Sequence, residues 1–239
     1  MATFVLVHGA MHGGWCWRDV RRHLAMQGHD VYTPTLTGQG DRRRLLARDV
    51  GVATHVSDIT DVLWFEDLHD VHLVLHSYAG VHAGPIADVC HDRLRSITYL
   101  AAFVTRPGEC LLDIEPPETA VRYRQLAADS GDGWRLPATG AFLEQWGVTD
   151  SAPAAWVEPR LTDFPLRCQT DPTEFDPETL AALPTSYVRH TSPPLASLDQ
   201  SFQRAVDASF PTYEVPCGHD TMIAAPELPA RVLLTIAES

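Results

Sequence analysis

The chain has 239 residues, of which 45% are hydrophobic, and its formal net charge at pH 7 is -13. All 18 basic residues are arginine, so lysine-based chemistry such as a Schiff base is excluded. A surface this acidic repels phosphate backbones and anionic headgroups, and we therefore expect neither nucleic acid nor a membrane surface as a partner.

The start of the chain and its cysteines predict the compartment. Met1-Ala2-Thr3 runs straight into an apolar segment, without the basic start and cleavage site of a signal peptide. No stretch is long and apolar enough for a membrane span. The cysteines at 16, 90, 110, 168 and 217 form neither an even disulfide framework nor a metal-ligand spacing. We expect a cytoplasmic protein with free thiols and no bound metal.

The first predicted strand, residues 3–7, ends in a loop of small residues. This loop, His8-Gly9-Ala10-Met11-His12-Gly13-Gly14, lets the backbone come close to a ligand. The amide of Ala10 is then a candidate donor to a developing oxyanion. We expect His8 and His12 to shape this loop or line the pocket. The alternative is an ordinary glycine-rich turn between a strand and a helix.

Strand and helix patterns alternate along the first hundred residues. This alternation predicts an α/β fold, with a mostly parallel sheet covered by helices on both faces. Ligands of such sheets bind at the carboxyl ends of the strands, where Ala10 and Ser77 fall. The predicted helices cover residues 17–27, 54–65 and 78–90, and the predicted strands after the first cover 29–35, 71–76 and 96–104.

Ser77 stands where a buried strand gives way to a helix. The strand, 71–76, is apolar and rich in valine and leucine, and small residues follow the serine at once. A strand–turn–helix holds the serine above the sheet and aims the amide of Tyr78 at the group that the serine attacks. We expect Ser77 to be a nucleophile and Tyr78 to supply the second oxyanion donor. The alternative is a serine that only caps a helix.

Residues 107–184 differ in character from the rest. Prolines become frequent, only short helical patterns remain, and three tryptophans appear at 134, 146 and 156. We interpret the segment as a cap inserted into a core formed by 1–106 and 185–239. Trp134 and Trp146, together with His12, are expected to line an apolar substrate pocket. The alternative is a linker or an irregular satellite subdomain.

A histidine near the C-terminus is singled out by its place. A strand is predicted over 212–216 and a helix over 226–237, and the turn between them carries Gly218-His219-Asp220. A serine hydroxyl needs a base, and histidine is the usual one near neutral pH. We expect His219 to be this base, and we expect His76 to point to the opposite side of the serine turn in a structural role.

Three stretches carry a family resemblance. They are the run of residues 8–17, the Leu-His-Ser-Tyr-Ala-Gly turn at 75–80, and Gly-His-Asp at 218–220. Together they resemble the α/β-hydrolase superfamily, and within it the branch of plant methylesterases and hydroxynitrile lyases with their bacterial esterase relatives. The serine turn departs from the G-x-S-x-G pattern, because Leu75 and Ala79 replace its glycines.

The resemblance implies a Ser-His-Asp esterase that needs no cofactor. Ser77 would be the nucleophile, His219 the base, and the amides of Ala10 and Tyr78 the oxyanion hole. The lyases of this branch carry a threonine after the first strand and a lysine after the histidine. Here Gly9 or Ala10 and Asp220 stand at those places, so lyase activity is disfavoured.

The acid of the triad is harder to assign. The family's acid usually follows the strand predicted here over 186–190, where His190-Thr191-Ser192-Pro193-Pro194 holds no carboxylate. Asp199 is the nearest candidate, and Asp207, on a predicted helix, is a second. A Ser–His pair without a protein acid is the remaining alternative, although losing the acid can cost about 10⁴ in turnover.

The leading function is therefore hydrolysis of a carboxylic ester, a methyl ester or lactone of a hydrophobic small molecule, through an acyl-Ser77 intermediate. One alternative is a repurposed enzyme of the same fold that opens or closes rings in specialised metabolism. The other is a non-catalytic protein that binds small molecules. The hydrophobic substrate is the expected partner, and a second copy of the chain, in a homodimer, is the protein partner that we consider.

Overall fold

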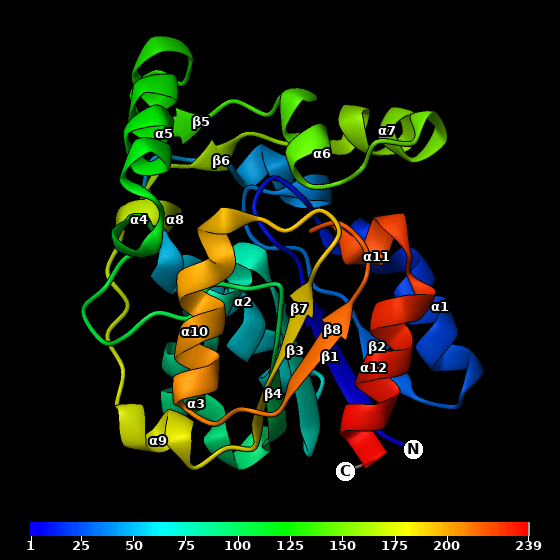
Figure 1. Ribbon diagram of the computed structural model, residues 1–239. Helices are drawn as coiled ribbons and strands as arrows, with labels where there is room; N and C mark the ends of the chain where they lie inside the picture. Colours follow the sequence, from blue (N-terminus) through cyan, green and yellow to red (C-terminus); the bar gives the residue numbers. More distant parts are fainter. Residues whose placement is uncertain (239) are drawn as a thin grey trace.

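A computed structural model describes residues 1–238 of the chain (Figure 1). Its centre is a six-stranded sheet with the order β2-β1-β3-β4-β7-β8, in which every neighbouring pair is parallel. The predicted α/β class with a mostly parallel sheet is confirmed. The strands are β1 (Thr3–Val7), β2 (Asp30–Tyr32), β3 (Val71–His76), β4 (Leu94–Leu100), β7 (Thr185–His190) and β8 (Thr212–Val215).

Helices cover both faces of the sheet, because its central strands are apolar on both sides. Every residue of β3 is buried, for example. On one face α1 (Arg18–Met26) packs against α12 (Glu227–Glu238), and the other face is covered by α2 (Val52–Phe65), α3 (Ala83–Cys90) and α10 (Asp199–Asp207) (Figure 1). The apolar side chains accordingly form two clusters, one on each side of the sheet.

The segment predicted as a cap divides into two parts. Its first part lies above the carboxyl ends of the strands, whereas α9 lies beside α3 at the opposite end of the sheet (Figure 1). The ring of Phe175, just before α9, lies where a side chain on Gly84 would stand. The elements of the segment are α4 (Leu111–Ile114), α5 (Pro117–Ser130), β5 (Arg135–Leu136), α6 (Ala141–Gln145), α7 (Ser151–Val157), β6 (Phe164–Pro165), α8 (Arg167–Thr170) and α9 (Pro177–Ala181).

Several element boundaries differ from the prediction. The strand predicted over 96–104 ends at Leu100, because the chain turns at Ala101, whose φ is 46°. The helix predicted over 78–90 begins as a tight 3-10 turn, η3 (Ser77–His82), before α3. Further short elements are η1 (Gly14–Trp17), η2 (Gly40–Leu45), η4 (His91–Arg93), η5 (Glu158–Arg160), η6 (Ala196–Leu198) and α11 (Thr221–Ala224).

Two chain-wide properties complete the description. Within residues 1–238, no helix has the length and apolar character needed to cross a bilayer. All five cysteines are free thiols and all are buried. Three of them belong to the larger apolar cluster, which extends from α2 and α3 into the segment above the sheet, and two belong to the cluster beneath α1 and α12.

Candidate active site

Ser77 occupies a strained turn between β3 and η3. Its φ of 54° lies in the left-handed region, a conformation that costs a non-glycine residue about 1 kcal/mol or more and is typical of functional sites. Leu75 is fully buried in the core and pairs with Val7 of β1, so the leucine is accommodated. The close approach that requires a glycine is at Gly80, where a Cβ would collide with the carbonyl oxygen of Phe103.

The loop after β1 lies directly against the serine. A Cβ on Gly9 would stand 2.7 Å from the Cβ of Ser77 and 3.0 Å from Nδ1 of His76, so a larger residue at this position would force the loop away from the serine. The backbone amides of Ala10 and Tyr78 donate no hydrogen bond to any described residue. Both amides are therefore free of protein acceptors.

His8 fastens this loop from behind. Its Nε2 accepts a hydrogen bond from the Leu36 amide at 3.0 Å, so the ring proton resides on Nδ1, which donates to the Gly9 carbonyl at 2.8 Å. Burial lowers the pKa of His8 to about 3. The ring thus stays neutral at physiological pH, and its role is to hold the loop in place.

His219 meets the serine from the turn between β8 and α11. Its Nε2 lies 2.9 Å from the Ser77 hydroxyl oxygen. Burial, with smaller effects from the charges of His76, His190 and His12, holds the pKa of His219 well below its ordinary value. The ring is therefore neutral at physiological pH, and its Nε2 can accept the serine proton.

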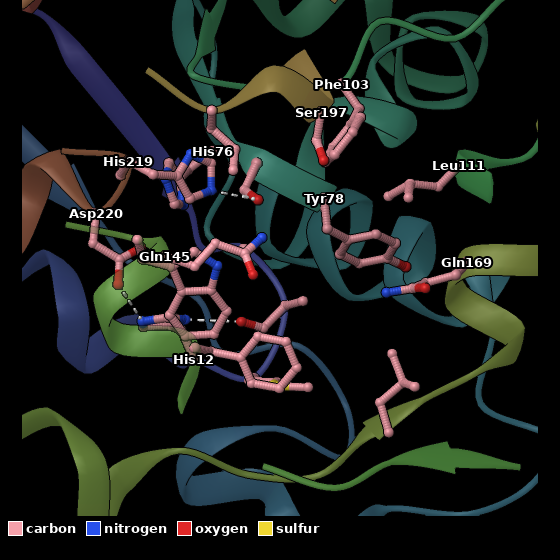
Figure 2. Close-up of a pocket in the computed structure, with 18 of the residues that line it drawn as sticks. His12, His76, Tyr78, Phe103, Leu111, Gln145, Gln169, Ser197, His219 and Asp220 are labelled. Atoms are coloured by element: carbon pink, nitrogen blue, oxygen red, sulfur yellow. Dashed lines mark hydrogen bonds and ion pairs between the residues drawn. The ribbon is translucent and has the colours of Figure 1, made fainter. Parts of the chain in front are cut away.

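The prediction that His76 points away from the site is wrong. Its ring lies against that of His219, with centroids 4.8 Å apart, and its Nε2 donates to the His219 carbonyl at 3.0 Å. Burial lowers the pKa of His76 to about 4. His76 is the last residue of β3 and shares the face on which Val74 packs, and Figure 2 shows it beside His219.

The structure does not bring Asp199 to His219. The helix α10 begins at Asp199, whose side chain is 64% exposed and pairs with Arg189 at 3.3 Å. Asp207, at the other end of α10, is exposed and accepts a hydrogen bond from Gln203. Within the described chain, Nδ1 of His219 has no hydrogen-bond partner. Neither aspartate is thus in a position to orient the base.

The end of β7, which precedes the family's usual acid position, holds another histidine. The ring of His190 packs edge-on against His219 with centroids 5.1 Å apart. Burial lowers the pKa of His190 to about 4, so an uncharged ring stands on this side of the base.

A buried ion pair lies on another side of the base. His12 donates from Nδ1 to the Ala10 carbonyl at 2.8 Å and from Nε2 to Asp220 Oδ2 at 3.1 Å. Because both nitrogens face acceptors, the ring carries two protons and a positive charge. Burial alone would lower the pKa of His12, but the charge and hydrogen bonds of Asp220 and the Ala10 carbonyl together raise it. His76, His219 and Asp220 each place one side-chain nitrogen or oxygen atom within 4.8 Å of the others.

A pocket opens above Ser77, between the core and the segment over it (Figure 2). Of the predicted lining residues, His12 and Trp146 are present, and their rings are 5.1 Å apart. Trp134 does not line the pocket, because its ring lies beneath the guanidinium groups of Arg48 and Arg135. Apolar walls come from Phe103, Leu111, Tyr123, Leu136 and Phe142.

Four polar residues that line the pocket could not be predicted from the sequence. They are Glu115 after α4, Gln145 in α6, Gln169 in α8 and Ser197 in η6. Three of them lie in short helices and Glu115 directly follows one, and segments this short show no hydrophobic period that separates a buried face from an exposed one. The one local signal is an isolated carboxylate between apolar neighbours, as at Glu115 between Ile114 and Pro116.

Comparisons of sequence and of structure with known proteins point to the same family. The model of the alpha/beta hydrolase family matches residues 4–232. The carbendazim hydrolyzing esterase of a Nocardioides species is 35% identical over 242 positions, which cover 95% of this chain and 96% of that protein. Methylesterase 4 of Arabidopsis thaliana is 33% identical over 42% of this chain and 39% of its own length.

Solved structures agree in fold. An extracellular alpha/beta-hydrolase from a Paenibacillus species superposes with a TM-score of 0.84 at 22% identity over the whole of both chains. A methylesterase from Arabidopsis superposes with a TM-score of 0.82 at 21% identity, over 100% of this chain and 99% of its own. At such identities the likeness concerns the fold alone.

Proposed function

This chain belongs to the alpha/beta hydrolase family, and we propose that it is a serine esterase that cleaves a methyl ester or lactone of a hydrophobic small molecule. The observation that carries the proposal is the 2.9 Å contact between the Ser77 hydroxyl and His219 Nε2, at a strained turn, and it is supported by the two backbone amides, of Ala10 and Tyr78, that have no protein acceptor. Nucleophile, base and oxyanion donors meeting at one point are the parts that acyl transfer needs.

The reaction follows from this geometry. His219 Nε2 takes the hydroxyl proton as Ser77 Oγ bonds to the ester carbonyl carbon, and the resulting oxyanion accepts hydrogen bonds from the amides of Ala10 and Tyr78. The carbon–oxygen bond to the alcohol then breaks, and His219 returns the proton to the leaving oxygen. A water molecule, deprotonated by His219 in turn, releases the acid and restores Ser77.

The base acts without a directly bonded acid in this proposal. His219 Nδ1 lacks a partner among the described residues, which supports the Ser–His pair considered as an alternative from the sequence. Asp220 is buried nearby, where it pairs with His12. A buried base with a depressed pKa is present in its reactive neutral form over a wide pH range.

The relatives and the pocket support the substrate class. The curated relatives are named for hydrolysis of carbendazim and for methylesterase activity. The walls of this pocket are mostly aromatic and aliphatic side chains, including Phe142 and Trp146, whose rings stack with centroids 5.2 Å apart. Such walls favour a flat apolar group on the acid or alcohol side of the ester.

A fluorophosphonate tests the mechanism without a known substrate, because labelling needs only an activated serine and an oxyanion hole. We expect a single adduct by intact mass on the wild-type protein and none on Ser77→Ala. His219→Ala should slow labelling by at least 10²-fold. A well-folded wild-type protein that takes no label would reject the esterase and favour the binding-protein alternative.

A further inference from the structure

The pocket contains two buried acceptor atoms that the proposed reaction does not use. Glu115 is 8% exposed and Gln169 is 5% exposed, and both line the pocket. Oε2 of Glu115 and Oε1 of Gln169 have no hydrogen-bond partner in the described chain. A buried polar atom left unpaired costs about 1–3 kcal/mol, so these two atoms call for an explanation.

The two residues belong to neighbouring elements. Glu115 directly follows α4, Gln169 lies in α8, and these helices pack against each other. In Figure 2, Gln169 lies beside Leu111 of α4, on the far side of Tyr78 from the catalytic histidine. Gln169 therefore lies on the wall of the pocket away from His219, and Glu115 follows the helix that packs against the helix of Gln169.

The surroundings make the carboxyl of Glu115 an unusual component of this wall. Leu111, Tyr123 and Leu136 also line the pocket, together with Ser197. Burial raises the pKa of Glu115 to about 7, against smaller lowering effects from a hydrogen bond of Ser197 and the charge of Arg122. A carboxyl that is costly to bury, and whose Oε2 receives no protein donor, is suited to receive one from a ligand.

We propose that Glu115 and Gln169 form a recognition subsite for an N–H or O–H donor on the substrate, so that the enzyme selects aromatic esters whose ring system carries such a donor at the end away from the ester. This inference rests on the proposed esterase function and adds the substrate class. A purely hydrocarbon acid would leave both acceptors unpaired in the complex, and sites built to hydrogen-bond a substrate group reject analogues that lack it.

A matched pair of esters tests the subsite. Methyl indole-5-carboxylate carries an N–H remote from the ester, and its 1-methyl derivative has the same ring without the donor. We expect wild-type kcat/KM to favour the N–H ester by at least 10-fold. Glu115→Leu should bring the ratio close to one, whereas Glu115→Gln, which keeps an acceptor oxygen, should retain part of it.

The exposed Glu118, one turn further along, provides the control variant. Glu118→Leu should keep the wild-type ratio. A wild-type ratio near one, or a high ratio that survives in Glu115→Leu, would overturn the subsite.

Turnover of 4-nitrophenyl acetate by the wild type separates the two proposals, because acetate is too short to reach the subsite. An enzyme that hydrolyses this ester but shows no preference between the indoles refutes the subsite and leaves the esterase intact. If no ester is hydrolysed, calorimetric binding of the two indoles to Ser77→Ala decides the subsite alone. Tighter binding of the N–H ester supports it, and equal or undetectable binding refutes it.

Discussion

Replacing Gly9 by alanine tests the oxyanion loop most directly. The added Cβ would lie 2.7 Å from the Cβ of Ser77 and 3.3 Å from its Oγ. Two carbon atoms in ordinary van der Waals contact lie at least about 3.4 Å apart. The loop must therefore move away from the serine by roughly 0.7 Å. The shift carries the amide of Ala10 with it.

The magnitude follows from the geometry of the lost hydrogen bond. An amide placed about 2.9 Å from the oxyanion would end near 3.6 Å, beyond an effective hydrogen bond. Losing one oxyanion donor costs about 3 kcal/mol of transition-state stabilisation, or roughly 10² to 10³ in kcat. KM should change little, because the contact strengthens only as the charge develops.

The assay is steady-state hydrolysis of 4-nitrophenyl acetate, with the melting temperature measured on the same samples. Gly28→Ala is the control, since a Cβ there has no neighbour within 4 Å although φ is 83°. It should cost about 1 kcal/mol of stability and leave kcat unchanged. A folded Gly9→Ala protein with kcat within threefold of wild type would refute the assignment of Ala10 to the oxyanion hole.

Three further predictions concern charge. Asp220→Asn removes one partner of a buried ion pair and should lower the free energy of unfolding in urea by about 3 kcal/mol. Because Asp220 raises the pKa of His12, this loss should be largest below pH 6.5 and shrink as the pH rises past that raised pKa. A loss under 1 kcal/mol would contradict the pairing. The acid limb of kcat/KM should fall below pH 6.5, since His219 must be neutral and its pKa is depressed; a limb at or above pH 6.5 would argue against this base. The pKa of Glu115 is raised from 4.5 to about 7, so the free energy of unfolding of the wild-type protein should fall by about 3 kcal/mol as the pH rises from 4.5 to 8. Urea titrations at the two pH values measure this decline, which Glu115→Gln should lack.

The fold and the positions of Ser77 and His219 in it could be predicted because their signals are local. Ser77 follows a buried strand immediately, and His219 follows the last strand within a few residues. Parallel strands with short connections bring such positions to one edge of the sheet whatever the details between them. The backbone therefore places these residues with little help from side-chain packing.

The remaining site residues depend on packing that local patterns do not encode. Asp199 fails as the acid because α10 begins at that very residue and turns it outward. The contact of His76 with His219 depends on where the loop after β8 lies. Glu115 comes from a proline-rich stretch, and its inward direction depends on contact between α4 and α8. Such features follow from how elements meet, and they become visible only in three dimensions.

Because all five thiols are buried, their alkylation reports where the protein opens locally. Burial also raises the pKa of Cys16 well above its ordinary value and that of Cys168 to about 12, so alkylating reagents meet both a steric barrier and a shortage of thiolate. Cys16 and Cys217 belong to the cluster beneath α1 and α12, whereas Cys110, just before α4, and Cys168, in α8, lie in the segment above the sheet. The order in which these two pairs become alkylated in dilute denaturant therefore records whether the α1–α12 layer or the segment above the sheet opens first.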